Sequence, residues 1–167
     1  MPGAVETVVG LRRAGYRVGI VTDSYHCAAE IVRRRVFADF CFSHFMQFNN
    51  GRASGRLNIC PAMIHPQGCV LHDHCKANVL AHICDRMGLN SSDFLAVGDG
   101  ENDVCMLKTA GCSVAFRPKS SVVRAAAQIA TNSLRDVLRM AERPALESQP
   151  ADHAGETALP SEEVLSN

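Results

Sequence analysis

The sequence predicts an α/β fold: a Rossmann-like, three-layer arrangement in which helices cover both faces of a parallel sheet. Two observations predict it. Short apolar segments of strand length alternate along the chain with amphipathic segments of about ten residues. Glycines or polar residues end several of these segments abruptly. Strands that alternate with helices in this way form parallel sheets through right-handed crossover connections.

The first half of the chain opens with a helix, a strand and a second helix. Residues 4–14 carry apolar side chains at helical spacing, with two arginines late in the segment and Gly15 just past its end. Both are typical of a helix C-terminus. A short apolar strand at 17–21 and a helix at 26–35 follow. The remaining segments are an aromatic, irregular stretch at 37–48, a hairpin-like pattern around a glycine turn at 49–57, and an unpatterned stretch at 58–75.

The second half shows a regular alternation of helices and strands. Residues 77–87 form an amphipathic helix that Gly88 ends, and residues 94–97 form a buried strand. After a helix that ends near Gly111, the expected elements are a strand at 113–116, a helix at 120–127, a short strand at 128–130 and a helix at 134–140.

Two parts of unequal character make up the chain. Residues 1–142 contain all the expected elements, and we expect them to form a single α/β core. Residues 143–167 hold three prolines and many small or acidic residues, with no Lys or Arg from 144 onward. This composition predicts a disordered acidic tail.

The composition excludes several classes of function. Of 167 residues, 47% are apolar and 20% are charged, and 17 basic side chains balance 17 acidic ones. Neutral overall charge gives no support for nucleic-acid or membrane-surface binding, and no apolar run is long enough to span a membrane. Eight cysteines without a recognisable signal peptide indicate reduced thiols in a cytoplasmic protein.

Residues 94–103, Phe-Leu-Ala-Val-Gly-Asp-Gly-Glu-Asn-Asp, form the most informative segment. Asp99 follows a strand directly, and ligands bind at that end of strands in open α/β sheets. Asp103 comes four residues later, where a strand-to-helix turn can bring it back to the same point. Two carboxylates with the amide of Asn102 between them suit Mg²⁺, which prefers oxygen ligands. Capping of the next helix needs only one such acid and leaves the second acid unexplained.

The segment Gly98-Asp99-Gly100-Glu101-Asn102-Asp103 resembles the fourth motif of haloacid-dehalogenase-type phosphatases. The continuation Met-Leu-Lys-Thr-Ala-Gly at 106–111 resembles the phosphoserine phosphatase branch of that superfamily. The resemblance extends from about residue 2 to about residue 139. It implies a Mg²⁺-dependent phosphatase that hydrolyses a small phosphomonoester, with phosphoserine favoured, through an aspartyl-phosphate.

The resemblance also implies roles for individual residues. Thr22 resembles the second motif, whose hydroxyl binds the phosphoryl group, and the backbone N–H of Asp23 would add a phosphate donor at a helix start. Lys76 resembles the third motif, whose lysine contacts the phosphate and the carboxylates around the metal. Asp99 would then bind Mg²⁺ directly, Asp103 would hold a metal-bound water and orient Lys76, and Asn102 would touch phosphate or substrate. Without the resemblance, Thr22 is equally well interpreted as a helix cap. Lys76 is then interpreted as a solvated surface lysine.

Two parts of the family pattern are missing from these 167 residues. No Asp-x-Asp spacing occurs, so the first motif, which supplies the nucleophile and the general acid, is absent. Asp23 is the only other acid that ends a strand, and Tyr25 stands where the general acid would be. The helical cap that the family places between its first and second motifs, where the substrate is selected, is absent too.

In the family, the first strand lies in the middle of the sheet, between the strands that end at Thr22 and Asp99. We therefore expect a core that lacks this central strand. Three outcomes are open: a truncated form of a longer protein, complementation by another chain or a homo-oligomer, or closure of the two strands onto each other with a distorted site.

Two rival functions remain. A structural zinc module is suggested by His and Cys residues between 60 and 84, but the paired Cys-x-x-Cys pattern of zinc fingers is absent. A loop followed by a helix with buried Ile83 and Cys84 is the favoured interpretation of that segment. The second rival is a non-catalytic remnant that binds phosphate and Mg²⁺ without a nucleophile. The residues that suggest zinc are His65, Cys69, His72, His74, Cys75, His82 and Cys84.

Overall fold

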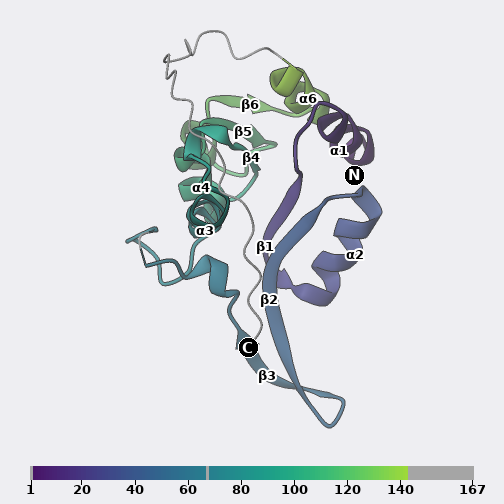
Figure 1. Cartoon of the computed structure of the whole chain (residues 1–167), viewed down its shortest axis with the longest axis vertical. Coiled ribbons are helices and arrows are strands. Elements are labelled where there is room, and N and C mark those ends of the chain that lie inside the picture. The colour runs from purple at the N-terminus through teal and green to yellow at the C-terminus, as the bar shows by residue number, and fades with distance from the viewer. Residues whose placement is uncertain (1, 67, 143–167) are drawn as a thin grey trace, which may run out of the picture.

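A computed structural model describes residues 2–66 and 68–142 of the chain (Figure 1). The expected tail at 143–167 lies outside the described residues. In the first part of the chain the elements are helix α1 (Ala4–Arg13), strand β1 (Gly19–Tyr25), helix α2 (His26–Val36), strand β2 (Phe40–Asn49) and strand β3 (Arg52–Asn58). Short 3₁₀ turns follow at Pro61–Met63, Ser91–Asp93 and Glu101–Asp103.

The second part alternates helices and strands as the sequence predicts. Helix α3 runs over the predicted range and ends at Gly88 in the left-handed conformation. The elements are α3 (Ala77–Met87), β4 (Leu95–Gly98), α4 (Val104–Thr109), β5 (Cys112–Phe116), α5 (Ser121–Ala126), β6 (Ile129–Thr131) and α6 (Leu134–Glu142). None of the described helices is both long and apolar enough to cross a membrane.

The predicted hairpin is confirmed. Strands β2 and β3 pair in antiparallel fashion, and Asn49 lies opposite Arg52. The two residues between them, Asn50 and Gly51, have φ values of 49° and 74°. Positive φ at both central positions is the requirement of a type I′ hairpin turn, which Asn-Gly meets best.

The segment at 37–48 is a strand for most of its length, not an irregular stretch. Strand β2 spans ten residues and pairs with β1 on one side and β3 on the other. Aromatic residues favour pleated, half-buried surfaces. Phe42 contacts Phe40 edge to face, at 5.8 Å between ring centroids, and also contacts His82 of α3 at 5.9 Å. Contacts with other elements therefore stabilise this strand, and the sequence pattern does not reveal them.

Helices cover both faces of the sheet formed by β4, β5 and β6, which is the predicted three-layer arrangement. All three strands are parallel. Ala115 of β5 packs in a cluster with residues of α3, α4 and α5, whereas the neighbouring Val114 packs with Leu11 of α1 and Val137 of α6. Alternate residues of one strand thus serve two helical layers.

The strands do not form one continuous sheet. Strands β1, β2 and β3 form one sheet and β4, β5 and β6 another, and among the described residues β1 and β4 do not pair. An apolar cavity of about 530 Å³ has residues of both strands in its walls, and residues of α1, α3 and α6 are among the others that line it. The outcome in which the two strands close onto each other is therefore wrong. The residues of β1 and β4 in the walls of this cavity are Gly19, Val21, Leu95, Ala96 and Val97.

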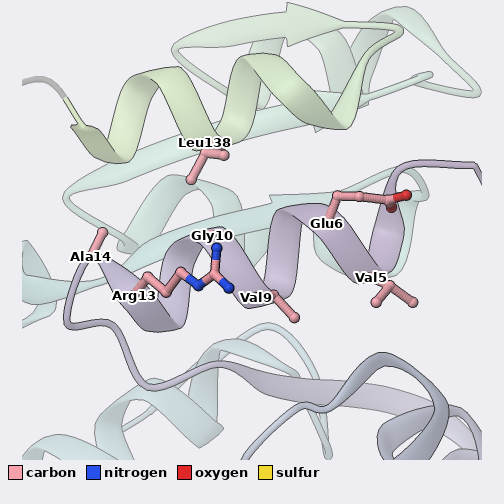
Figure 2. Close-up of a pocket in the computed structure, with 7 residues that line it drawn as sticks. All are labelled: Val5, Glu6, Val9, Gly10, Arg13, Ala14 and Leu138. Atoms are coloured by element: carbon pink, nitrogen blue, oxygen red, sulfur yellow. The ribbon is translucent and has the colours of Figure 1, made fainter.

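Helices α1 and α6 pack side by side on one face of the sheet formed by β4, β5 and β6 (Figure 2). Leu138 projects from α6 toward Gly10 of α1, and an added Cβ at Gly10 would lie 2.7 Å from the Leu138 side chain. This close approach joins the first described helix to the last. It holds the N-terminal part of the chain against the sheet formed by β4, β5 and β6.

Candidate active site

Polar side chains gather where β1 and β4 end. Asp99 follows β4 directly, and a 3₁₀ turn places Asn102 and Asp103 immediately before α4. Asp23 lies near the end of β1, and Lys76 occupies the N-cap position of α3. The structure therefore brings together residues from three separated segments, as the sequence predicts for the carboxyl edge of a sheet.

Asp103 is the most fully bonded residue of the site. Its Oδ2 atom accepts hydrogen bonds from the backbone N–H groups of Asp99 and Gly100, at 2.9 and 3.0 Å. Its Oδ1 atom accepts a hydrogen bond of 2.7 Å from Nζ of Lys76. The residue is 6% exposed. Asp103 is thus positioned to orient both Lys76 and the turn that carries Asp99.

These contacts decide the charge state of Asp103. Burial alone would raise the pKa of its carboxyl group, since burial disfavours charge. The hydrogen bond from Lys76 and the two backbone donors outweigh burial and hold this pKa below its ordinary value. Asp103 is therefore a carboxylate, and Lys76 has a buried anion as its partner.

Lys76 lies between two carboxylates. Besides Asp103, its Nζ atom lies 3.6 Å from Oδ2 of Asp23. The amide nitrogen of Asn102 donates to the same Asp23 oxygen at 3.0 Å. The Lys76 side chain is only 13% exposed, so it is not the solvated surface lysine of the alternative interpretation. A contact across the two sheets therefore joins the end of β1 to the turn after β4.

Gly98 allows this turn to close. A Cβ atom at Gly98 would lie 2.4 Å from Cβ and 2.7 Å from Cγ of Asp103. At Gly100 the nearest such atom would be Oδ2 of Asp103, at an ordinary 3.9 Å. The close approach is thus a requirement at Gly98 and not at Gly100.

Asp99 carries a more accessible carboxylate than Asp103. Its side chain is 49% exposed, and its Oδ2 atom pairs with Nζ of Lys119 at 2.7 Å. The hydrogen bond that Lys119 donates to the Asp99 carboxylate raises the pKa of Lys119. Sequence reasoning missed Lys119. Its position soon after β5 was a usable signal. Neighbouring parallel strands end at the same edge of a sheet, so residues that follow β4 and β5 lie close together.

The end of β1 differs from its prediction. The strand continues to Tyr25, beyond the expected end at Val21, and its pairing with β2 shifts register between Val21 and Tyr25. Thr22 and Asp23 therefore lie in an irregular part of the strand, and the next helix begins only at His26. The expectation that the N–H of Asp23 lies at a helix start is wrong. Irregularities of this kind re-aim side chains and are common beside active sites.

Thr22 also does not cap the following helix. Its Oγ1 atom accepts a hydrogen bond of 3.1 Å from the backbone N–H of Ser24. This local turn leaves the hydroxyl hydrogen of Thr22 available for a further acceptor. Thr22 and Asp23 both remain partly accessible at the end of β1.

His44 is a second residue that sequence reasoning missed. It is 2% exposed, and its Nδ1 atom accepts a hydrogen bond of 3.1 Å from the backbone N–H of Cys60. In the neutral ring the proton is then on Nε2. Among the described residues this atom has no hydrogen-bond partner, although it lies 3.6 Å from Oδ1 of Asp23. A buried donor is thus directed at Asp23.

The potential metal ligands of the site fall into groups that favour different metals. The Asp99 carboxylate offers exposed oxygen, which suits Mg²⁺ or another hard cation. Asp103 has both oxygens engaged by protein donors, so it would act through a bound water. Asp23, His44 and His74 could place a carboxylate oxygen and two ring nitrogens within 4.8 Å of one another, a mixed set that suits a transition metal better than Mg²⁺.

Comparisons with known proteins show what this chain is similar to. A family model described as haloacid dehalogenase-like hydrolase matches residues 70–137. A phosphoserine phosphatase of Methanocaldococcus jannaschii is 30% identical over 138 residues, which cover 82% of this chain and 61% of that protein. A phosphoserine phosphatase of Albidiferax ferrireducens is 34% identical over 121 residues, or 72% of this chain and 49% of that protein. The chain thus spans about half to three fifths of the length of these relatives.

Solved structures show the same relationship. A phosphoserine phosphatase in its apo form is 28% identical and superimposes with a TM-score of 0.69, over 82% of this chain and 64% of that one. A substrate-bound phosphoserine phosphatase complex is 27% identical, with a TM-score of 0.68 over 83% of this chain and 62% of the other. Residues 70–137 therefore match the haloacid dehalogenase-like hydrolases, and the chain is phosphoserine phosphatase-like in sequence and fold.

Proposed function

We propose that this chain carries the metal-binding and phosphate-binding part of a phosphomonoester hydrolase that acts through an aspartyl-phosphate. One observation carries the proposal: the Lys76 ammonium lies 2.7 Å from a carboxylate oxygen of Asp103 and 3.6 Å from one of Asp23, where β4 and β1 end. A preorganised cation at that edge is suited to stabilise charge on a transferring phosphoryl group. The likeness to proteins named phosphoserine phosphatase supports the same conclusion.

Mg²⁺ is part of the proposal. The half-exposed carboxylate of Asp99 would bind it directly, and Asp103 would hold it through water while orienting Lys76. Mg²⁺ is usually bound by one or two carboxylates together with waters and substrate phosphate. Asp99 and Asp103 match this coordination pattern. When bound, Mg²⁺ would neutralise charge on the phosphoryl oxygens.

Three further residues would contact the phosphorylated substrate. Lys76 would donate to a phosphoryl oxygen, and the free hydroxyl hydrogen of Thr22 would donate to another. Asn102 is exposed, so its amide can turn from Asp23 toward phosphate or the substrate's organic part. Asp23 would contribute through its backbone and by holding Asn102 and Lys76. Phosphoserine is the favoured substrate, and other small phosphomonoesters fit the same groups.

The nucleophile of this reaction would come from residues other than these 167. Asp23 is a poor substitute, because its carboxylate accepts from Asn102 and lies beside Lys76 and His44. The apolar cavity between β1 and β4 has room for an extended segment that would pair with both strands. We propose that the strand with the nucleophilic aspartate lies there, supplied by a longer polypeptide or by a different chain.

The alternative is a non-catalytic protein that binds phosphate and Mg²⁺ at the same groups. The lack of an Asp-x-Asp spacing in the sequence favours it. A reducing compartment such as the cytoplasm suits both proposals, because all eight cysteines are free.

Two experiments separate these possibilities. The first is the genomic sequence upstream of Met1, where an in-frame Asp-x-Asp-x-Thr or Val within one small domain's length would identify the source of the nucleophile. The second is release of inorganic phosphate from phosphoserine and from an aryl phosphate with Mg²⁺, by the 167-residue chain and by any longer form. We expect turnover only where the motif is present. It should be lost in Asp99→Asn and kept in Glu101→Gln, which changes an exposed acid of the same turn. Turnover that survives Asp99→Asn would overturn the proposal.

A further inference from the structure

Four side chains that are not used in the proposed reaction come together beside α4. Cys69, His72 and Cys75 lie in the loop before α3, and Cys105 lies in the first turn of α4. One donor atom from each of them lies within 4.8 Å of all the others. Cys75 is buried, Cys69 and Cys105 are partly buried, and His72 is exposed.

The spacing of these atoms matches the edges of a tetrahedron around zinc. With Zn–S bonds of about 2.3 Å and Zn–N bonds of about 2.0–2.1 Å, two sulfurs lie roughly 3.8 Å apart, and a sulfur and a nitrogen roughly 3.6 Å apart. The Sγ atoms of Cys69 and Cys105 are 3.8 Å apart. Nδ1 of His72 lies 3.3 Å from Sγ of Cys69 and 3.7 Å from Sγ of Cys105.

We propose that Cys69, His72, Cys75 and Cys105 bind one zinc ion. Three thiolates and an imidazole are a usual ligand set for zinc, and four protein ligands leave no open position for substrate. The site is thus structural. It ties the loop before α3 to the helix that follows Asp103, and its sulfur ligands set it apart from the oxygen ligands proposed for Mg²⁺.

The loop is held in the required shape by contacts on α3. The buried Asn78 side chain accepts a hydrogen bond from the backbone N–H of Cys69 at 2.5 Å and donates to the carbonyl of Met63 at 2.7 Å. The backbone N–H of Cys75 donates to the same Met63 carbonyl at 2.9 Å. Both cysteines of the loop are therefore anchored through their backbones. Such contacts keep metal ligands in place before the ion binds.

Apolar packing does not account for the turn between the two loop cysteines. Val70 and Leu71 are 95% and 77% exposed. The backbone N–H groups of Leu71 and Ala77 are hydrogen-bonded to the thiols two residues earlier, those of Cys69 and Cys75. Donors directed at sulfur suit thiolates that bind a metal. A zinc ion would supply the cohesion that this turn lacks from side-chain burial.

Sequence reasoning named three of these four residues, Cys69, His72 and Cys75, but not the fourth. The fourth ligand, Cys105, lies inside the segment that resembles a phosphatase motif, and the loop supplies Cys-x-x-His-x-x-Cys in place of a Cys-x-x-Cys pair. The favoured interpretation of a buried Cys84 is also incorrect, since Cys84 is only partly buried. Neither point is visible without the fold.

Metal content of the full chain tests the proposal. We expect one zinc per chain by elemental analysis after expression in zinc-containing medium and purification under reducing conditions. The single substitutions Cys69→Ser and Cys105→Ser should each reduce this to a trace. Cys27→Ser, which alters an exposed cysteine of α2, should leave the zinc content unchanged. His74→Ala should also keep it, since His74 belongs to the separate group with Asp23 and His44.

Two measurements on the unaltered chain guard against misfolded variants. Cobalt in place of zinc should give the visible bands of a tetrahedral ion and a thiolate charge-transfer band. Alkylation followed by mass spectrometry should find Cys69, Cys75 and Cys105 protected until a chelator is added, and Cys27 reactive throughout. Metal-free protein with reduced thiols, a Cys69–Cys105 disulfide, or zinc that is lost in His74→Ala and kept in Cys69→Ser would overturn the proposal. Phosphatase activity plays no part in these readouts.

Discussion

Lys76 and Asp103 are 27 positions apart in the sequence, yet Nζ of Lys76 lies 2.7 Å from Oδ1 of Asp103. Their side chains are only 13% and 9% exposed. The contact joins the start of α3 to the turn that carries Asp99. The orientation of that turn therefore depends on one partly buried ion pair.

Breaking this pair should destabilise the protein. Lys76→Met leaves the Asp103 carboxylate without its cation, and Asp103→Asn removes the anion, so each should lower the free energy of unfolding by about 2–4 kcal/mol. Denaturant unfolding of both variants and of the double variant should give a coupling energy of about 1–3 kcal/mol. Lys108→Met alters an exposed lysine of α4 and should change stability by less than about 0.5 kcal/mol. Additive effects of the two substitutions would contradict direct coupling.

Asp103 should also contribute a pH dependence to stability. Its folded-state pKa is lowered, so its contribution is fully present above the ordinary carboxyl value and is lost as pH falls through the folded value. The difference in unfolding free energy between the unaltered protein and Asp103→Asn should be constant near neutrality and shrink below about pH 4. Unfolding curves measured across this range test the sign. A difference that grows in acid would indicate a raised pKa.

The two glycines of the motif should respond differently to alanine. At Gly98 a methyl group would lie within 2.4 Å of Asp103, whereas at Gly100 it meets no atom closer than 3.9 Å. Gly98→Ala should cost about 1–3 kcal/mol of stability through overpacking. Gly100→Ala should leave stability within roughly 1 kcal/mol of the original. Thermal unfolding of the pair checks this, and equal losses would show that close packing at Gly98 is not the reason for its presence.

The lysine that pairs with Asp99 should matter little for stability. Lys119 is 71% exposed, and exposed ion pairs contribute about 0–1 kcal/mol. Lys119→Ala should therefore change unfolding free energy far less than Lys76→Met, although both remove a lysine that contacts an aspartate of the same motif. Salt titration gives an independent check, because only the exposed pair should weaken with ionic strength. A loss as large as that of Lys76→Met would contradict this ranking.

Local signals explain what the sequence predicts well. The helix at 77–87 ends at Gly88 as expected, because a glycine in the left-handed conformation is a local stop signal. The hairpin at Asn50 and Gly51 is equally local. The turn at 98–103 was found because its glycines, acids and amide lie within six residues.

Long-range packing explains what the sequence does not predict. Strand β2 depends on pairing with two other strands and on contacts such as Phe42 with His82. The continuation of β1 past Val21 depends on irregular pairing with β2. The fold alone brings Lys119 and His44 to the site. It also brings Cys105 to the cluster with Cys69, His72 and Cys75. Apart from the position of Lys119 soon after β5, no local pattern marks these contacts.

Magnesium-dependent phosphate binding tests the central claim most directly. Amide resonances of the full chain can be followed by NMR during titration with inorganic phosphate, with and without Mg²⁺. We expect saturable shifts at Thr22, Lys76 and the turn at 98–103 that need both ions. These shifts should be lost in Asp99→Asn and kept in Glu101→Gln. Shifts that map elsewhere, or that persist unchanged in Asp99→Asn, would contradict the assignment of this edge as a metal-assisted phosphate site.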